Sequence, residues 1–126
     1  MKIKPLFYIC KHCGNLVSMV EDKGVSVVCC GEPMTRLEPN TVDAAAEKHL
    51  PAVTRDGETI HVEVGSVLHP MTEEHYIQWV YVASDTLGQR KCFAPGDRSV
   101  HDFCDSEGAV AVYAYCNLHG LWKVDA

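Results

Sequence analysis

The 126-residue chain has no apolar run approaching the ~18 residues that a membrane-spanning helix requires. No long apolar stretch follows Lys2 and Lys4, so a secretory signal is not expected. Basic residues are few, because 11 Lys and Arg stand against 17 Asp and Glu, a net charge of −6. This acidic balance, without a basic stripe, argues against nucleic-acid binding. We therefore expect a cytoplasmic protein that binds neither membrane nor nucleic acid.

Charge and cysteine are distributed unevenly along the chain. Residues 1–37 hold five basic and three acidic residues, a net charge of +2, whereas residues 38–126 hold six and fourteen, a net charge of −8. Four of the seven cysteines lie within residues 10–30. Pro39 interrupts regular structure where both features change. The sequence therefore predicts two domains, residues 1–37 and 38–126.

The cysteines of the first domain form a Cys10-x-x-Cys13 turn and, fifteen residues later, the adjacent pair Cys29-Cys30. In a cytosolic protein this pattern indicates a metal site more than a disulfide framework. Gly14 suits the turn because glycine adopts positive φ without strain. Iron is favoured because adjacent cysteines, joined by one peptide, should distort the tetrahedron of a structural zinc site. Structural zinc and a vicinal disulfide are the alternatives.

The segment between the two cysteine pairs predicts a short hairpin. Residues 16–20 and 25–28 are rich in apolar side chains and flank a turn signal at residues 22–24. The hairpin would return the second pair to the first. Thirty-seven residues cannot bury a self-sufficient core, so bound metal must supply much of the folding free energy.

Residues 38–126 predict mostly strands, with β-rich runs at 59–64, 76–83 and 109–115 separated by glycine-containing turns. One short helix is expected at residues 42–46, capped by Asn40 or Thr41. An antiparallel β-sandwich is the simplest fold for this pattern. The fold class is therefore all-β, with a small metal-clipped N-terminal module followed by a sandwich.

Five possible metal donors lie at the ends of the predicted elements: His49, His69, His75, Cys116 and His119. Loop side chains can converge on one point, and Pro70 breaks the strand that would hold His69 and His75 about 20 Å apart. A structural zinc site needs only four donors. Five nitrogen and sulfur donors describe an octahedron with one open position, which suits redox iron. A thiolate opposite that position would push electron density towards a bound ligand.

Five motifs occur in order along the chain: YICKHCGN at 8–15, VCCGEPM at 28–34, EKHLP at 47–51, HPM with HYI within 69–77, and YCNLHG at 115–120. Together they resemble desulfoferrodoxin, the two-iron class of superoxide reductase, over nearly the whole length. The resemblance implies a desulforedoxin-like first domain with one iron on its four cysteines. It implies an immunoglobulin-like second domain that carries the catalytic iron.

The resemblance places the four histidines in the equatorial plane of a ferrous iron, with Cys116 axial. It implies one-electron reduction of superoxide to hydrogen peroxide without oxygen evolution. Lys48 would then attract superoxide and hydrogen-bond the peroxide product, a role that suits a cation in an acidic domain. Glu47 would cap the oxidised iron after product leaves. Rubredoxin as electron donor and a homodimer are also implied, and unpaired strand edges make a dimer plausible.

The remaining cysteines and histidines, and the backbone beside Cys116, are expected to have the following roles. Backbone N–H groups of Leu118 and His119 should hydrogen-bond the Cys116 sulfur. Cys92 and Cys104 are expected to be reduced, partly buried strand cysteines, with pairing or reaction with peroxide as the alternative. The other histidines should be ordinary surface or core residues: His12, His61 and His101.

Three other functions compete with superoxide reduction. An electron carrier or metal-storage protein would have no use for an open position beside Lys48. A zinc-dependent interaction module that binds nucleic acid would need a basic surface. An iron oxygenase would want two histidines and one carboxylate, and the chain offers more donors than that.

Overall fold

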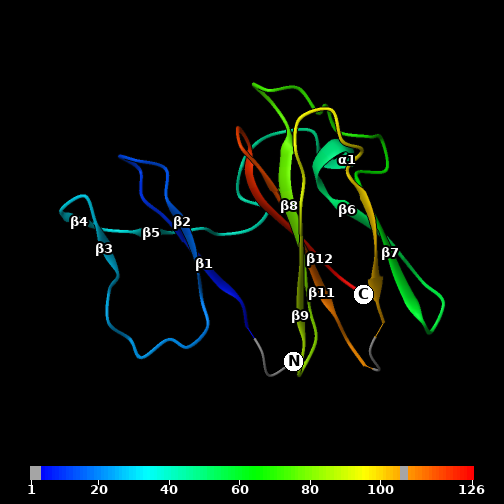
Figure 1. Ribbon diagram of the computed structural model, residues 1–126, viewed down its shortest axis with the longest axis horizontal. Helices are drawn as coiled ribbons and strands as arrows, with labels where there is room; N and C mark the ends of the chain where they lie inside the picture. The colour runs from blue at the N-terminus through cyan, green and yellow to red at the C-terminus, as the bar shows by residue number, and fades with distance from the viewer. Residues whose placement is uncertain (1–3, 106–107) are drawn as a thin grey trace. The chain divides into compact units, whose positions relative to one another are not determined.

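The structure is a computed structural model that describes residues 4–105 and 108–126. These divide into two compact units, Lys4–Glu38 and Pro39–Ala126 (Figure 1). Among the described residues, no helix is long and apolar enough to cross a membrane.

The first unit holds five short strands: β1 (Leu6–Ile9), β2 (Leu16–Met19), β3 (Val28–Cys29), β4 (Glu32–Pro33) and β5 (Thr35–Arg36). Strand β1 is the centre of an antiparallel sheet in the order β2-β1-β5, and β3 pairs with β4. Its buried apolar residues are Phe7, Cys10 and Met34. A core this small agrees with the expectation that bound metal stabilises the unit.

The hairpin predicted for residues 16–28 is wrong, although its turn is present. Strand β2 pairs with β1, in a register that sets Ile9 opposite Leu16. The cysteine turn causes this, because the N–H of Cys10 donates to the carbonyl of Asn15 at 2.8 Å and reverses the chain directly after β1. The N–H of Gly24, which has a φ of 80°, still donates to the Asp22 side chain.

The second unit is a sandwich of two antiparallel sheets. One sheet has the order β10-β7-β6, and the other has the order β12-β11-β8-β9. The strands are β6 (Pro51–Arg55), β7 (Thr59–Val64), β8 (Ile77–Ala83), β9 (Gly88–Cys92), β10 (Val100–Cys104), β11 (Ala111–Cys116) and β12 (Gly120–Asp125). Three strands packed on four is the architecture of an immunoglobulin-like sandwich, and the predicted all-β fold class is confirmed.

The core of the sandwich lies between the two sheets. Strand β7 alternates as expected, with Ile60, Val62 and Val64 all at most 1% exposed. They share one cluster with Val80 of β8 and Val112 of β11, and Cys116 at the end of β11 belongs to the same cluster. One of the five residues singled out as possible metal donors is therefore anchored directly in the hydrophobic core.

The helix lies four residues later than predicted, as α1 (Ala46–His49) at one end of the sandwich (Figure 1). Its N-cap is Ala45, without a side-chain cap. Asn40 is engaged elsewhere, because its side chain accepts the N–H of Lys123 at 2.9 Å and donates to the Lys123 carbonyl at 3.0 Å. Pro51 ends the helix by holding Leu50 in extended conformation. His49 is thus the last helical residue and does not follow the helix.

Two candidate metal centres

Five donor atoms of the sandwich lie within 4.8 Å of one another, from His49, His69, His75, Cys116 and His119. His49 ends α1, and His69 lies in the turn after β7, where its N–H donates to the Val64 carbonyl at 3.0 Å. His75 precedes β8, while Cys116 ends β11 and His119 precedes β12. The sequence expectation that element ends bring these residues together agrees with this geometry.

The four imidazoles form a ring in the order 49, 69, 75, 119. Neighbouring ring centroids are 4.6, 4.5, 5.0 and 4.9 Å apart around this ring, and the diagonal from His49 to His75 is 6.4 Å. The sulfur of Cys116 lies 3.4 Å from Nε2 of His69 and 3.9 Å from Nδ1 of His119. Four nitrogens and one sulfur therefore surround one point.

Hydrogen bonds behind the rings identify the nitrogens that face this point. Nδ1 of His49 donates to the Ala45 carbonyl, and Nδ1 of His69 donates to the Pro70 carbonyl, each at 2.7 Å. A carbonyl only accepts, so both Nε2 atoms carry lone pairs, and these atoms are 3.1 Å apart. Nδ1 of His119 is also 3.1 Å from the His49 Nε2.

The donor set fits a bound cation. The Nε2 of His75 is buried and has no hydrogen-bond partner within the described residues. Lone pairs that face each other across 3.1 Å repel unless a cation lies between them. The donors are imidazole nitrogens and a thiol sulfur. Such ligands favour a transition metal over magnesium or calcium, which prefer oxygen ligands.

Burial prepares these residues as neutral ligands. Desolvation lowers the pKa of His69 to about 4 and also lowers the pKa values of His49 and His75. Burial raises the pKa of the Cys116 thiol, and the backbone N–H groups of Leu118 and His119 act in the opposite direction by hydrogen-bonding the sulfur. This agrees with the hydrogen bonds expected at that sulfur. Metal binding would take the thiolate and release its proton.

Glu47 and Lys48 directly precede His49 and are both exposed. The Lys48 ammonium contributes to the lowered pKa values of His49 and His75, so its charge acts inside the ring. The carbonyl of Glu47 accepts hydrogen bonds from the Val67 N–H at 3.0 Å and from the Ser66 hydroxyl at 3.2 Å. The turn after β7 thus fixes the backbone that carries both charges.

The second donor group lies in the first unit, where Sγ atoms of Cys10, Cys13, Cys29 and Cys30 lie within 4.8 Å of one another. Sulfurs of Cys29 and Cys30 are 4.0 Å apart and all seven cysteines of the chain are free, so the structure contains no vicinal disulfide. Gly14 has the expected positive φ, 82°.

The four thiols also fit a cation. Backbone N–H of Cys13 is the main cause that lowers the pKa of Cys10 to about 6. Side-chain hydrogen bonds with Cys13 and Cys10 raise the pKa of Cys30 to about 12. The Cys30 thiol therefore keeps its proton at neutral pH unless a cation lies among the four sulfurs, and a tetrahedral sulfur site takes zinc or iron.

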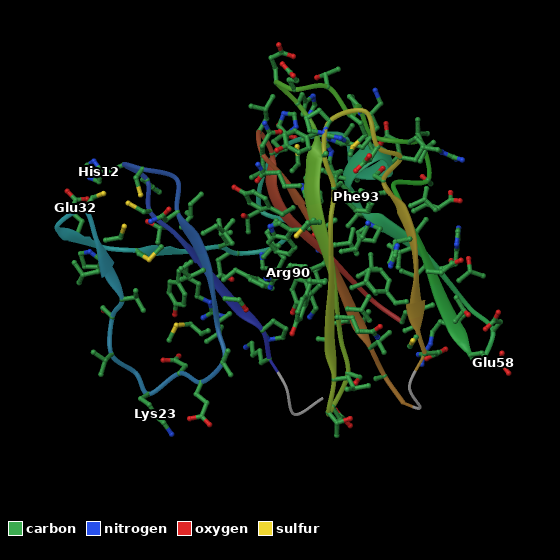
Figure 2. The ribbon with its side chains drawn as sticks, in the orientation of Figure 1. His12, Lys23, Glu32, Glu58, Arg90 and Phe93 are labelled. Atoms are coloured by element: carbon green, nitrogen blue, oxygen red, sulfur yellow. The ribbon has the colours of Figure 1, made fainter. Side chains whose placement is uncertain are left out.

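The remaining histidines lie outside both donor groups, as expected. His12 pairs with Glu32 at 3.0 Å, and the two side chains lie together in Figure 2. His101 packs its ring against Phe103, with centroids 4.8 Å apart. Cys92 and Cys104 end strands β9 and β10, but both are exposed, so the expected partial burial is wrong: edge strands leave their side chains in solvent.

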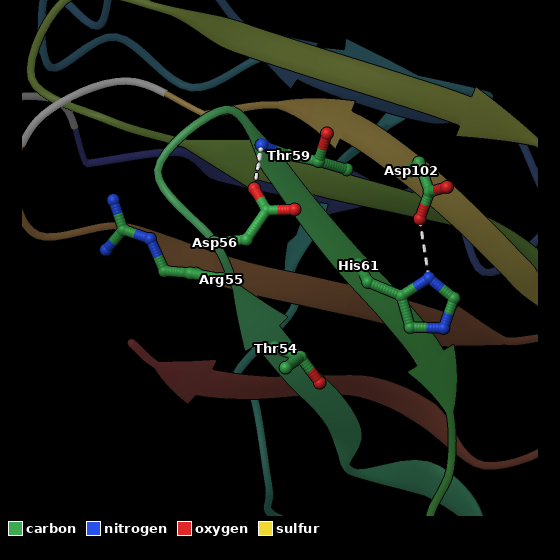
Figure 3. A pocket seen from close by; sticks show the side chains of 6 residues that line it. All are labelled: Thr54, Arg55, Asp56, Thr59, His61 and Asp102. Carbon is green, nitrogen blue, oxygen red and sulfur yellow. Dashed lines mark hydrogen bonds and ion pairs between the residues drawn. The ribbon is translucent and has the colours of Figure 1, made fainter.

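His61 lines a separate polar pocket of about 290 Å³, with Thr54, Arg55, Asp56, Thr59 and Asp102 (Figure 3). Nδ1 of His61 donates to Asp102 at 2.5 Å, and Nε2 lies 3.0 Å from the Glu63 carboxylate. These carboxylates raise the pKa of His61, with the Glu63 hydrogen bond the larger cause. Both ring nitrogens are occupied, so His61 acts here as a link between strands.

Comparison with known proteins agrees with this geometry. Residues 41–125 match the desulfoferrodoxin family, and residues 6–37 match the desulfoferrodoxin N-terminal domain. A desulfoferrodoxin homolog of Archaeoglobus fulgidus is 45% identical over 116 residues, 92% of this chain and 93% of that protein. The desulfoferrodoxin of Nitratidesulfovibrio vulgaris is 43% identical over 119 residues, 94% of each chain.

Solved structures give the same result. The superoxide reductase of Treponema pallidum superposes with a TM-score of 0.78 at 35% identity, covering 97% of this chain and 99% of the other. The one-iron superoxide reductase of Giardia intestinalis covers 64% of this chain and 97% of its own, with a TM-score of 0.56 at 27% identity. The chain belongs to the desulfoferrodoxin family.

Proposed function

We propose that the chain is a superoxide reductase, which converts superoxide, one electron and two protons into hydrogen peroxide. The observation that carries the proposal is the ring of four imidazoles with the Cys116 sulfur beside it. Within the described residues this donor group has five members, one fewer than an octahedral metal ion accepts. The remaining position is available to a small diatomic anion.

The five donors would hold one iron ion, which supplies the electron for reduction of superoxide when it is bound in the ferrous state. His49 and His69 would bind through Nε2, because their Nδ1 atoms donate to backbone carbonyls. His75 would bind through its unpartnered Nε2, and His119 through Nδ1, which lies 3.1 Å from the His49 Nε2. Hydrogen bonds from backbone N–H groups lower the donor strength of the Cys116 sulfur.

Glu47 and Lys48, the exposed residues before His49, act on the substrate and the product in this proposal. Lys48 would attract the superoxide anion towards a domain whose net charge is −8 and would hydrogen-bond the product through water. Glu47, which is held on the same one-turn helix, would offer its carboxylate to the oxidised iron after product has left. Both roles are supported by the charge that these residues exert on His49.

The finer assignments are part of the same proposal. Residues 1–37 form a domain that binds a second iron through Cys10, Cys13, Cys29 and Cys30, and residues 38–126 form the catalytic domain. A small electron-transfer protein such as rubredoxin returns the electron. Seven free thiols favour the reducing cytoplasm. A homodimer is supported by the open edges of both sandwich sheets, and light scattering would test it.

Metal analysis combined with superoxide consumption tests the function. The purified chain should contain two irons, and the pre-reduced protein should consume one superoxide per hydrogen peroxide formed, with no oxygen evolved. A His69→Ala variant, which retains the four-cysteine site, is the matched control and should lose this reaction. Two zincs per chain, or oxygen released with half the yield of peroxide, would contradict the proposal. Bound iron with no superoxide consumption would indicate an electron carrier instead.

A further inference from the structure

Trp122 contacts two of the five donor residues from behind, and sequence reasoning did not single it out. We propose that Trp122 is a positioning residue, which holds the His49 ring and the His119 backbone in the geometry that binds metal. The inference rests on the proposed metal centre, but it does not depend on reaction with superoxide.

Two different contacts of one buried side chain carry the proposal. Trp122 is 4% exposed and lies on β12 opposite Ala114 of β11. Its indole stacks on the His49 imidazole, with centroids 5.0 Å apart and planes inclined by 23°. Its Nε1–H donates to the His119 carbonyl at 3.1 Å. The indole therefore connects two neighbours in the histidine ring.

The stack completes the support of His49. The hydrogen bond from Nδ1 to the Ala45 carbonyl fixes the rotation of the imidazole, but it leaves the ring free to tilt about that bond. An indole face packed against the ring removes the tilt. The lone pair of Nε2 is then aimed at the centre before metal arrives, which lowers the entropy lost on binding.

The hydrogen bond to His119 matters because the position of the metal-binding nitrogen of His119 depends closely on the backbone. His119 faces the centre with Nδ1, the ring nitrogen nearer the main chain, so a shift of the backbone moves the donor almost directly. Its turn continues into Gly120, which has a φ of 78°. By fixing the His119 carbonyl, the indole N–H fixes this turn and the nitrogen that it presents.

The only other tryptophan provides a matched control. Trp79 is 8% exposed, and its ring stacks on Tyr115 with centroids 5.5 Å apart and planes inclined by 12°. Trp79→Phe and Trp122→Phe are the same truncation at similar burial, and both keep an aromatic ring. Trp122→Phe removes the N–H that donates to the His119 carbonyl.

Cobalt binding tests the proposal in the full chain. Both variants are made in a background with Cys13→Ser and Cys30→Ser, which removes the two exposed thiols of the first unit, so that the visible spectrum of Co²⁺ reports the histidine centre. Trp122→Phe should raise the Co²⁺ dissociation constant about tenfold, as loss of an outer-shell partner does, and shift the ligand-field bands. Trp79→Phe should leave both unchanged. Equal effects of the two truncations, or an unchanged constant and spectrum in Trp122→Phe, would overturn the proposal.

A measurement on the unsubstituted chain covers the case in which Trp122→Phe does not fold. Because coupling is reciprocal, a hydrogen bond that favours metal binding must itself be strengthened by metal. Hydrogen exchange at the Trp122 indole N–H, followed by NMR, should slow when Zn²⁺ is added. Exchange that is unaffected by Zn²⁺ refutes the positioning role. Proven Co²⁺ and Zn²⁺ effects without superoxide reduction would refute the proposed enzyme while leaving this inference intact.

Discussion

Lys48→Ile should slow the capture of superoxide without changing the metal centre. Lys48 is exposed beside His49, and its charge reaches both His49 and His75. Residues 38–126 carry a net charge of −8, so this ammonium opposes a field that repels the substrate anion. In the described part of the chain, the hydrogen bonds of the donor side chains do not include the Lys48 side chain, so the absorption spectrum of a bound iron should be retained.

Coulomb's law sets the size of the effect. In water, a unit charge about 6–10 Å from an anion contributes about 0.4–0.7 kcal/mol, which is about a two- to threefold change in rate. Lys48→Glu removes one charge and adds the opposite one, so its loss should be the square of this factor, about four- to tenfold. Lys48→Arg keeps the charge and should react like the unsubstituted chain.

Pulse radiolysis of the pre-reduced protein measures the second-order rate constant directly. The differences should be largest at low ionic strength and nearly vanish at about 1 M salt, where the screening length falls to about 3 Å. Equal constants for Lys48→Ile and Lys48→Arg at low salt would refute electrostatic attraction. A loss that persists unchanged at high salt would instead assign Lys48 a role after capture.

Three further predictions concern the two units separately. Cys13→Ser should remove the first metal yet leave superoxide reduction by the second largely intact; loss of activity with the second iron still bound would make the first an obligatory relay. The pKa of His61, raised by Glu63 and Asp102, should be found above 6.5 by NMR and should fall in Asp102→Asn. Since the folded-state pKa is raised, these contacts stabilise the fold fully below about pH 6.5 and lose their contribution as pH rises through the higher folded value; comparison of wild type and His61→Gln in urea should show the difference shrinking with pH. Ile60→Ala, at a fully buried position of β7, should lower the free energy of unfolding by about 2–5 kcal/mol, and a loss under 1 kcal/mol would contradict the assigned core.

The sequence was most informative where a local pattern fits only one kind of structure. Alternation in residues 59–64 predicts a half-buried strand, and β7 has those bounds. The five side chains that lie within 4.8 Å of one another were also singled out from sequence, because turns that flank histidine and cysteine give the side chains freedom to converge. These side chains lie together because the ends of their strands lie together. The pattern of apolar runs locates those strand ends to within a few residues.

Partners that depend on tertiary contacts were not predictable. Asn40 looked like a helix cap, but its amide binds the backbone of Lys123, 83 residues away. Residues 16–20 looked like half of a hairpin with residues 25–28, yet an earlier strand pairs with them first. Trp122 carries no metal-binding group, so only its stack on His49 identifies it. A tryptophan three residues after a candidate ligand is the sole signal that the sequence offered.

The sandwich holds together donor atoms whose lone pairs repel one another. Nε2 atoms of His49 and His69 face each other at 3.1 Å with their N–H groups turned away, and this arrangement is unfavourable until a cation is bound. The surrounding fold holds the donor residues in place against this repulsion. Cys116 is 0% exposed in the core, and Pro51 ends α1 at His49. His75 and His119 remain partly exposed on the other side of the ring. The buried donors thus fix the geometry of the ring, and the exposed Lys48 directly precedes one of them, His49.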